Sequence, residues 1–297
     1  MFVSVVIPTY NKLPRLKLTL ASIENQTLGQ ENFEVIIVDD CSTDDTEAFI
    51  ASKTWPINLR CFRLDKNSGR SVARNIGIEN SKGELIAFTD DDCLVSPDFL
   101  QNHIRLHKKN CVSHGAIWNL PFFKFFSDPA NGILYKEFEG RDIANLGNIS
   151  ITKTEVKHNF QKIIKMGRKT KFEKQVEKCL ADEQTAFHWL SCTGGNIAIE
   201  ADLLKKAGGF DKQLGKPWGI EDIELGYRLH KNGVKFQYIN DAPVYHIAHY
   251  RANSEELSKR AVEYMENKYP ELTTCKLYEN FFNGTLEYDL LVQTLKS

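Results

Sequence analysis

Three consecutive carboxylates, Asp90, Asp91 and Asp92, follow directly after the apolar run 85–88. Adjacent acids repel one another, so a sheet that carries them at its edge needs a counter-charge. Carboxylate oxygens suit Mg²⁺ or Mn²⁺, which commonly bind substrate phosphates as well. The pattern therefore predicts a divalent cation that holds a nucleotide-activated substrate, and a solvated acidic turn is the alternative. In an extended segment, Asp90 and Asp92 would face one pocket while Asp91 faces elsewhere.

A second acidic pair, Asp39 and Asp40, follows the apolar run 35–38. Ligands of open parallel sheets bind in the crevice at the carboxyl ends of the strands. We therefore expect the two acidic groups to meet at one site. Asp39 and Asp40 can hydrogen-bond a uracil imide or a ribose hydroxyl, or one of them can cap the helix expected near Asp44.

Two further charged pairs lie at the starts of expected helices. Arg70 and Arg74 are one turn apart, so they share a helix face and can contact a diphosphate or pair with the acids. Glu221 and Asp222 open another helix, whose positive end favours their ionised form. A general base must be ionised and must reach the nucleophile's proton. These two acids therefore are candidates for a base, with helix-start stabilisation as the alternative.

His246 and His249 follow an expected strand. A neutral imidazole completes the coordination of Mn²⁺ more readily than that of Mg²⁺, and a structural role is the alternative. The chain has no Gly-x-Gly-x-x-Gly after its first strand, no phosphate-binding P-loop and no Gly-x-Ser-x-Gly elbow. These absences disfavour a dinucleotide oxidoreductase, a P-loop NTPase and a serine hydrolase.

The first hundred residues alternate between strand and helix, which predicts a mostly parallel sheet. Continuous apolar runs mark strands buried on both faces, and apolar spacings of three and four mark helices. The expected strands are 3–7, 35–38, 59–64 and 85–88, and the expected helices are 13–23, 44–53, 69–81 and 96–108, the last with Ser96 as N-cap.

Beyond residue 110 the pattern weakens. Residues 119–150 suggest irregular connections, and 152–178 carry nine Lys or Arg against three Glu. This basic segment predicts an amphipathic lid or a peripheral membrane contact, with a solvated helix or loop as the alternative. The expected later elements are a strand after 194–196, a turn at 208–211, a helix at 221–231, strands at 234–239 and 244–249, and surface helices after 253 broken at Pro270.

Composition is that of an ordinary globular protein: 297 residues, 42% hydrophobic, with a net charge of −1. A net charge this small does not favour binding to nucleic acid. No stretch of the sequence reaches the roughly 18 apolar residues of a membrane span. The N-terminus reads as a strand rather than a signal peptide. Seven cysteines without a Cys-x-x-Cys pair indicate reduced thiols. We expect a cytoplasmic protein, with the inner membrane surface as a further location.

The chain resembles the family 2 glycosyltransferases with the GT-A fold. Four stretches carry the resemblance, in the family's order and spacing: 5–11, 34–44, 67–75 and 83–92. A later stretch, 208–229, resembles the acceptor-side segment of galactosyl- and N-acetylgalactosaminyltransferases, including chondroitin-polymerase modules. The resemblance implies an α/β fold of GT-A type, with a mostly parallel Rossmann-like sheet flanked by helices. It also implies a nucleotide-sugar half at 1–110, an acceptor half of the same domain at 111–250 and a C-terminal helical tail at 251–297.

The resemblance also implies roles for individual residues. The donor-binding residues would be Pro8, Thr9 and Tyr10 around uridine, Asp40 on uracil, Asn67 through Arg74 beside base and ribose, and Asp90 at the ribose or metal. Asp91 would also belong to the donor-binding residues. Asp92 and His246 would bind the metal, with His249 as the near alternative. Asp222 would be the catalytic base with Glu221 beside it, and Gly195, Trp218 and Gly219 would border the acceptor and sugar pocket. Ile220 stands where the galactosyltransferase version commonly has Gly.

Together these expectations describe an inverting glycosyltransferase that depends on Mn²⁺ or Mg²⁺. It would move a hexose or N-acetylhexosamine from a UDP-sugar to a hydroxyl of a glycan, a lipid-linked saccharide or another acceptor. Two alternatives stay open. A sugar-phosphate nucleotidyltransferase would release pyrophosphate instead of UDP, and a non-catalytic sugar-nucleotide-binding protein would bind without turnover.

Overall fold

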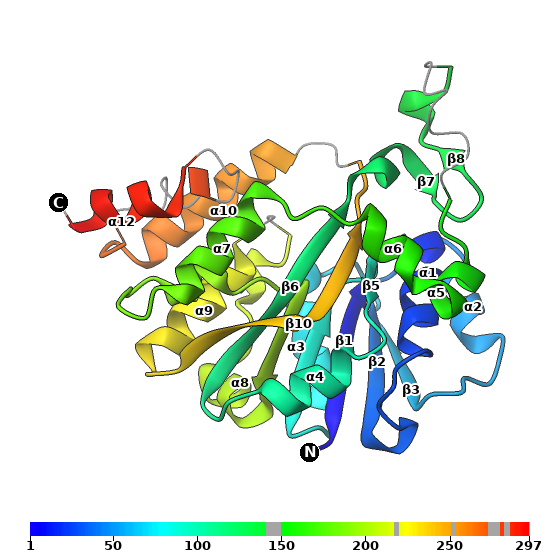
Figure 1. The fold of residues 1–297 in the computed structure, drawn as a ribbon, viewed down its shortest axis with the longest axis horizontal. Coiled ribbons are helices and arrows are strands. Elements are labelled where there is room, and N and C mark those ends of the chain that lie inside the picture. The colour runs from blue at the N-terminus through cyan, green and yellow to red at the C-terminus, as the bar shows by residue number, and fades with distance from the viewer. Residues whose placement is uncertain (141–149, 217–219, 251–253, 273–279, 282–285, 297) are drawn as a thin grey trace.

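A computed structural model describes residues 1–140, 150–216, 220–250, 254–272, 280–281 and 286–296. Within these residues, eight strands form one sheet in the order β3-β2-β1-β4-β9-β6-β10-β5 (Figure 1). The bounds of the strands are β1 Val3–Thr9, β2 Phe33–Asp39, β3 Leu59–Arg63, β4 Leu85–Thr89, β5 Cys93–Val95, β6 Cys111–Leu120, β9 Asn196–Glu200 and β10 Lys235–Ile247. A separate two-stranded hairpin consists of β7 Phe126–Asp128 and β8 Ile133–Leu134.

The sheet is mostly parallel, as expected. Strands β1 to β4 pair in parallel, and β6 and β10 form a second parallel pair. Strand β9 joins the two groups by pairing antiparallel with both β4 and β6. Strands β1, β2 and β4 are almost wholly buried, which explains their continuous apolar sequences.

Helices cover both faces of the sheet. One face packs against α1 Leu13–Ile23, α2 Thr46–Ala51 and α4 Phe99–Leu106. The other packs against α3 Arg70–Asn80, α7 Lys171–Ala181, α8 Ala201–Ala207, α9 Glu221–Lys231, α10 Ser254–Lys268 and α12 Tyr288–Lys296. In Figure 1, α10 and α12 lie together beside α7 and α9, so the C-terminal helices extend this second layer. No helix among the described residues is both long and apolar enough to span a membrane.

The helix expected at 96–108 begins later, at Phe99, and Ser96 does not cap it. Residues 96–98 form a turn, and just before them Cys93–Val95 form strand β5, which pairs antiparallel with β10. The backbone N–H of Ser96 donates to the carbonyl of Pro243 at 3.0 Å. This edge pairing is a long-range contact, so the local Ser-Pro pattern was a misleading start signal.

Two other expectations needed correction. The strands expected at 234–239 and 244–249 are one strand, β10, with an irregularity in its pairing between Ile239 and Val244. The segment 119–150, expected to be irregular, begins inside β6 and continues into the β7–β8 hairpin, while 141–149 lies outside the described residues.

The basic segment 152–178 forms three helices, α5 Lys153–His158, α6 Phe160–Met166 and α7. A capping box between Thr152 and Glu155 starts α5. Helices α5 and α6 bury Val156 and Ile163 against the β7 side of the molecule, and α7 buries its apolar face against the second helical layer. The segment is therefore packed onto the fold by its apolar side.

Candidate active site

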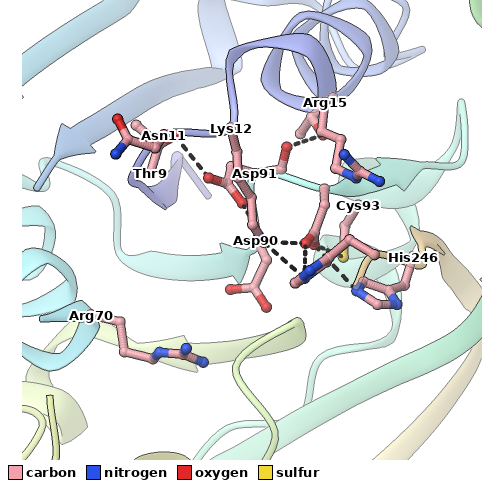
Figure 2. Close-up of polar contacts among 12 residues, drawn as sticks. Thr9, Asn11, Lys12, Arg15, Arg70, Asp90, Asp91, Cys93 and His246 are labelled. Carbon is pink, nitrogen blue, oxygen red and sulfur yellow. Dashed lines mark hydrogen bonds and ion pairs between the residues drawn. The ribbon is translucent and has the colours of Figure 1, made fainter. Parts of the chain in front are cut away.

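The triple acid is a turn rather than an extended segment, and its three side chains have different partners. Asp90 pairs with Arg74 at 3.1 Å, Asp91 accepts from Thr9 Oγ1 at 2.8 Å, and Asp92 accepts from Lys12 Nζ at 2.5 Å. In Figure 2 the Asp90 carboxylate points away from Asp91. Asp90 and Asp91 line a pocket of about 740 Å³ and Asp92 does not, which contradicts the expectation that Asp90 and Asp92 face one pocket while Asp91 faces elsewhere.

Because each acid has its own hydrogen-bonding or charged partner, the repulsion between the three carboxyl groups is reduced. Burial raises the pKa of Asp91 to about 6, against the opposing effect of Lys12. Burial also acts on Asp92, but Lys12 and the histidines hold the pKa of Asp92 well below its usual range. Burial acts on Asp90 as well, but nearby cations, chiefly Arg74, lower the pKa of Asp90, so Asp91 alone of the three carboxyls has a raised pKa.

Asp92, His246 and His249 form a group that can hold a metal ion, with ligand atoms within 4.8 Å of one another. Asp92 Oδ1 lies 3.5 Å from His246 Nε2, and Asp92 Oδ2 lies 3.1 Å from His249 Nε2. The strand β10 places His246, and His249 follows two residues after its end. Both histidines, offered by the sequence as alternatives, thus face the same carboxylate.

The second ring nitrogens of these histidines also have partners. His246 Nδ1 lies 3.1 Å from the Oδ1 of Asn119, and His249 Nδ1 lies 3.1 Å from the carbonyl of Tyr250. Both partners can accept from Nδ1, and this contact orients each ring so that Nε2 faces Asp92 and is the nitrogen that would ligate a cation. One oxygen and two imidazole nitrogens suit Mn²⁺ better than Mg²⁺. The residues present therefore fit a divalent cation.

Arg74 connects the triple acid to helix α9. Its guanidinium is 1% exposed and lies 3.1 Å from Asp90, 3.2 Å from Glu221 and 2.7 Å from Asp222. Arg70 lies 3.4 Å from Glu221. Of the two roles that the sequence left open for these arginines, the structure shows pairing with the acids.

Asp222 has the pKa expected of a base at neutral pH. Burial raises the pKa of Asp222 to about 7, Arg74 opposes this rise and the charge of Glu221 adds to it. A hydrogen bond from the backbone of Gly194 also favours the ionised form. A Cβ at Gly194 would lie 2.4 Å from Arg74 Nη2 and 2.6 Å from Asp222 Oδ1, so only glycine permits this close approach.

The pocket of about 740 Å³ lies beside these groups. The expected donor residues that line it are Pro8, Thr9, Tyr10, Asp40, Asn67, Asp90 and Asp91. Arg70 lines it as well, whereas Arg74 is buried beneath. Gly195 lies next to Asp90, and Trp218 and Gly219 fall outside the described residues.

Asp40 holds the loop at the start of α3. Its two oxygens accept from the backbone N–H groups of Ser68 at 2.6 Å and Gly69 at 2.8 Å, and burial raises its pKa. Asp39 instead binds Arg63, while Asp44 accepts from Thr46 at the start of α2. Neither Asp39 nor Asp40 caps α2.

Sequence reasoning missed several residues of this site, three of which are Lys12, Tyr135 and Tyr250. Lys12 reaches Asp92, and Tyr135 and Tyr250 line the pocket with their rings 6.2 Å apart. Lys12 could have been predicted, because it is a cation that directly follows the matched stretch 5–11. Tyr135 could not, because it belongs to the hairpin region where the periodic pattern fails.

The sheet order, the two helical layers and the acidic strand ends define an α/β enzyme of GT-A type. The family described as "Glycosyl transferase family 2" matches residues 4–178, and "N-terminal domain of galactosyltransferase" matches 175–250. The chain belongs to glycosyl transferase family 2.

Two curated relatives illustrate this membership. YfnE of Bacillus subtilis, described as an uncharacterized glycosyltransferase, is 28% identical over 97% of this chain and 75% of its own length. The hyaluronan synthase of Pasteurella multocida is 28% identical over 82% of this chain. This chain covers 24% of that synthase, so it spans about a quarter of the longer relative.

Solved structures share the fold. TarS of S. aureus, in complex with UDP-GlcNAc, aligns with a TM-score of 0.59 and 18% identity over 96% of this chain and 71% of that chain. The mannosyltransferase PcManGT of Pyrobaculum calidifontis, in complex with GDP-Man and Mn²⁺, aligns with a TM-score of 0.57 and 16% identity over 99% and 75%. At these identities the likeness shows the fold alone.

Proposed function

We propose that this glycosyltransferase is metal-dependent and inverting, and that it moves a hexose or N-acetylhexosamine from a UDP-sugar to an acceptor hydroxyl. One observation carries the proposal. A cation-binding group and a carboxylate with a pKa of about 7 lie at one site, and they are connected through Asp90 and Arg74. These are the two functions that displacement of a nucleotide by a hydroxyl requires.

Asp92, His246 and His249 would hold a divalent cation, which neutralises negative charge on the departing diphosphate. Asp222 takes the proton of the acceptor hydroxyl, and its contribution to the rate is about 10²–10⁴-fold. The acceptor oxygen forms a bond to the anomeric carbon while the bond from that carbon to the UDP oxygen breaks. Attack from the face opposite UDP inverts the configuration.

Arg74 keeps this base in place. It neutralises part of the charge of Asp90, Glu221 and Asp222, so one buried and two partly buried carboxylates coexist around one guanidinium. Glu221, fully buried and also near Arg70, would hold the acceptor or the donor sugar beside the base.

For the donor, we propose that Pro8, Thr9, Tyr10, Asp40 and Asn67 form the uridine end of the pocket, with Asp90 and Asp91 at the ribose. The structure of TarS with UDP-GlcNAc supports a nucleotide-sugar donor, and that of PcManGT with Mn²⁺ supports a divalent metal. We also propose that residues 1–110 supply the donor half, 111–250 the acceptor half and 251–297 a helical tail. Gly195, Trp218 and Gly219 belong to the proposed acceptor side.

For the acceptor, we propose a glycan or a lipid-linked saccharide, handled in the cytoplasm. A peripheral contact with the inner membrane surface through 152–178 is one way to reach a lipid-linked acceptor. Ile164 of α6 is 40% exposed between the basic residues Lys162 and Lys165, which supports such a contact. Co-sedimentation with anionic and neutral vesicles tests it, and absence of binding to both excludes it.

The decisive experiment incubates the protein with a panel of nucleotide sugars and Mn²⁺, and measures both UDP and pyrophosphate. UDP release with one sugar donor is the expected result. Pyrophosphate release would favour the nucleotidyltransferase alternative, and binding without either product would favour a non-catalytic binding protein.

A further inference from the structure

Lys12 directs its ammonium into the cation-binding group. Its Nζ lies 2.5 Å from Asp92 Oδ2, 3.0 Å from His249 Nε2 and 3.5 Å from Asp91 Oδ1. Asp92 is buried, whereas the Lys12 side chain is about a quarter exposed, at 26%. A positive charge of the chain itself therefore contacts two of the three groups that can hold a metal.

A divalent cation and this ammonium compete for the same atoms. Metal ions of this size bind carboxylate oxygens and imidazole nitrogens at about 2.0–2.2 Å. Lys12 uses the Oδ2 of Asp92 and the Nε2 of His249, which are two of those ligand atoms. Two cations so close together in a buried site would repel each other strongly. The two occupants are therefore mutually exclusive.

The side chain of Lys12 can leave without disturbing the backbone. The Lys12 carbonyl accepts from the N–H groups of Arg15 and Leu16, both at 3.0 Å, and so starts helix α1. Its side chain makes no capping hydrogen bond to that helix and borders the 740 Å³ pocket. Rotation of the side chain into the pocket therefore releases Asp92 while the start of α1 is preserved.

We propose that Lys12 is an internal competitor of the divalent cation, whose ammonium holds Asp92 and His249 until the metal displaces it. The inference rests on the proposed function, because it requires Asp92, His246 and His249 to bind the metal. Two consequences follow. Lys12 lowers the affinity for metal, and it stabilises the buried carboxylate of Asp92 when metal is scarce.

The test measures Mn²⁺ binding to chelator-treated, dialysed protein through the electron paramagnetic resonance signal of free Mn²⁺. Lys12→Met keeps the length of the side chain and removes the charge. We expect Mn²⁺ to bind this variant more tightly, by roughly 5- to 150-fold, the usual range of coupling between two binding events. Lys17→Met is the matched control, because Lys17 is an exposed residue of α1 whose Nζ lies over the Phe49 ring. Its Mn²⁺ affinity should equal that of the wild type.

Thermal unfolding supplies a second measurement that does not depend on activity. Without added metal, Lys12→Met should unfold at a lower temperature than the wild type, because Asp92 has lost its ammonium partner. Saturating Mn²⁺ should raise the unfolding temperature of Lys12→Met more than that of the wild type, since tighter binding to the native state stabilises it more.

The outcomes separate this inference from the function on which it rests. If Lys12→Met binds Mn²⁺ as weakly as the wild type or more weakly, the competition is overturned. If Asp92→Asn abolishes binding in the same experiment, the assignment of Asp92 to the metal site still stands. Absence of Mn²⁺ binding in the wild type and in Lys12→Met overturns both the competition and the metal dependence.

Discussion

Arg74 Nη1 and Asp222 Oδ1 form a 2.7 Å ion pair between residues 148 positions apart in the chain. The pair joins helix α3, which begins at the donor pocket, to helix α9, which carries the proposed base. The base is thus held by a group that also binds Asp90 at the end of β4. The proposed donor and acceptor sides of the site are connected through this guanidinium, with the Arg70–Glu221 pair beside it.

Replacing Asp222 with Asn should abolish turnover while donor binding persists. Asn removes the proton acceptor but keeps the size of the side chain, so we expect the rate to fall by about 10²–10⁴-fold. UDP release measures the rate, and calorimetry measures UDP affinity. Asp202→Asn is a suitable control, since Asp202 is an exposed acid in the first turn of α8. Near-normal turnover in Asp222→Asn would remove this residue from the mechanism.

The pH profile should report the raised pKa of Asp222. A base works only when ionised, so kcat/KM should be full above pH 7 and fall about tenfold per unit below a pKa of about 7. Glu221 contributes to that raised pKa through its negative charge. Glu221→Gln should therefore lower the pKa of Asp222 and move the acidic limb to lower pH. If the acidic limb of the pH profile is unchanged in Glu221→Gln, the limb reports the ionisation of a group other than Asp222.

Removal of the metal should stop the reaction. EDTA is expected to abolish UDP release, and Mn²⁺ should restore it better than Mg²⁺ because two of the three proposed ligands are imidazoles. His246→Ala and His249→Ala should each weaken Mn²⁺ binding by about tenfold or more, whereas the exposed His158→Ala should not. Full activity of chelator-treated protein would contradict the metal dependence.

Gly194→Ala should perturb the site through one added methyl group. The new Cβ would lie within 3 Å of both Arg74 and Asp222, so the ion pair must separate or the loop must shift. We expect a lower unfolding temperature and a loss of turnover of at least about tenfold, equivalent to roughly 1.4 kcal/mol. Gly195→Ala controls for the unfolding temperature, because its Cβ would meet nothing closer than 3.6 Å. Equal unfolding temperatures in the two variants would refute the steric argument.

The sequence predicted the parts of this fold that depend on local pattern. Buried parallel strands such as β2 are apolar throughout, so their ends, and the acids there, could be located. Helix α9 was expected at 221–231 and is found there, because its acidic start and Asn232–Gly233 end are local signals.

Long-range contacts could not be predicted in the same way. Lys12 contacts His249, which lies 237 positions later in the chain, and the local sequence around either residue does not indicate this contact. Likewise, the sequence could not decide whether Arg74 contacts a diphosphate or pairs with the acids, because only the folded sheet brings α3 against α9. An acidic turn was one alternative for residues 90–92, but the partner of each acid could not be predicted, because three identical side chains do not reveal which neighbour each will contact.

Strand β9 has a consequence for how the chain assembles on the ribosome. Leu85 of β4 pairs with Glu200 of β9, so the open edge of β4 must wait for a segment made about 115 residues later. At about 5–20 residues per second, that wait lasts roughly 6–23 s. During this interval the unpaired edge of β4, whose residues are apolar except for Thr89, is available to other nascent chains. We therefore expect shielding of that edge until β9 emerges to favour correct folding, and slow translation between the two segments to favour aggregation.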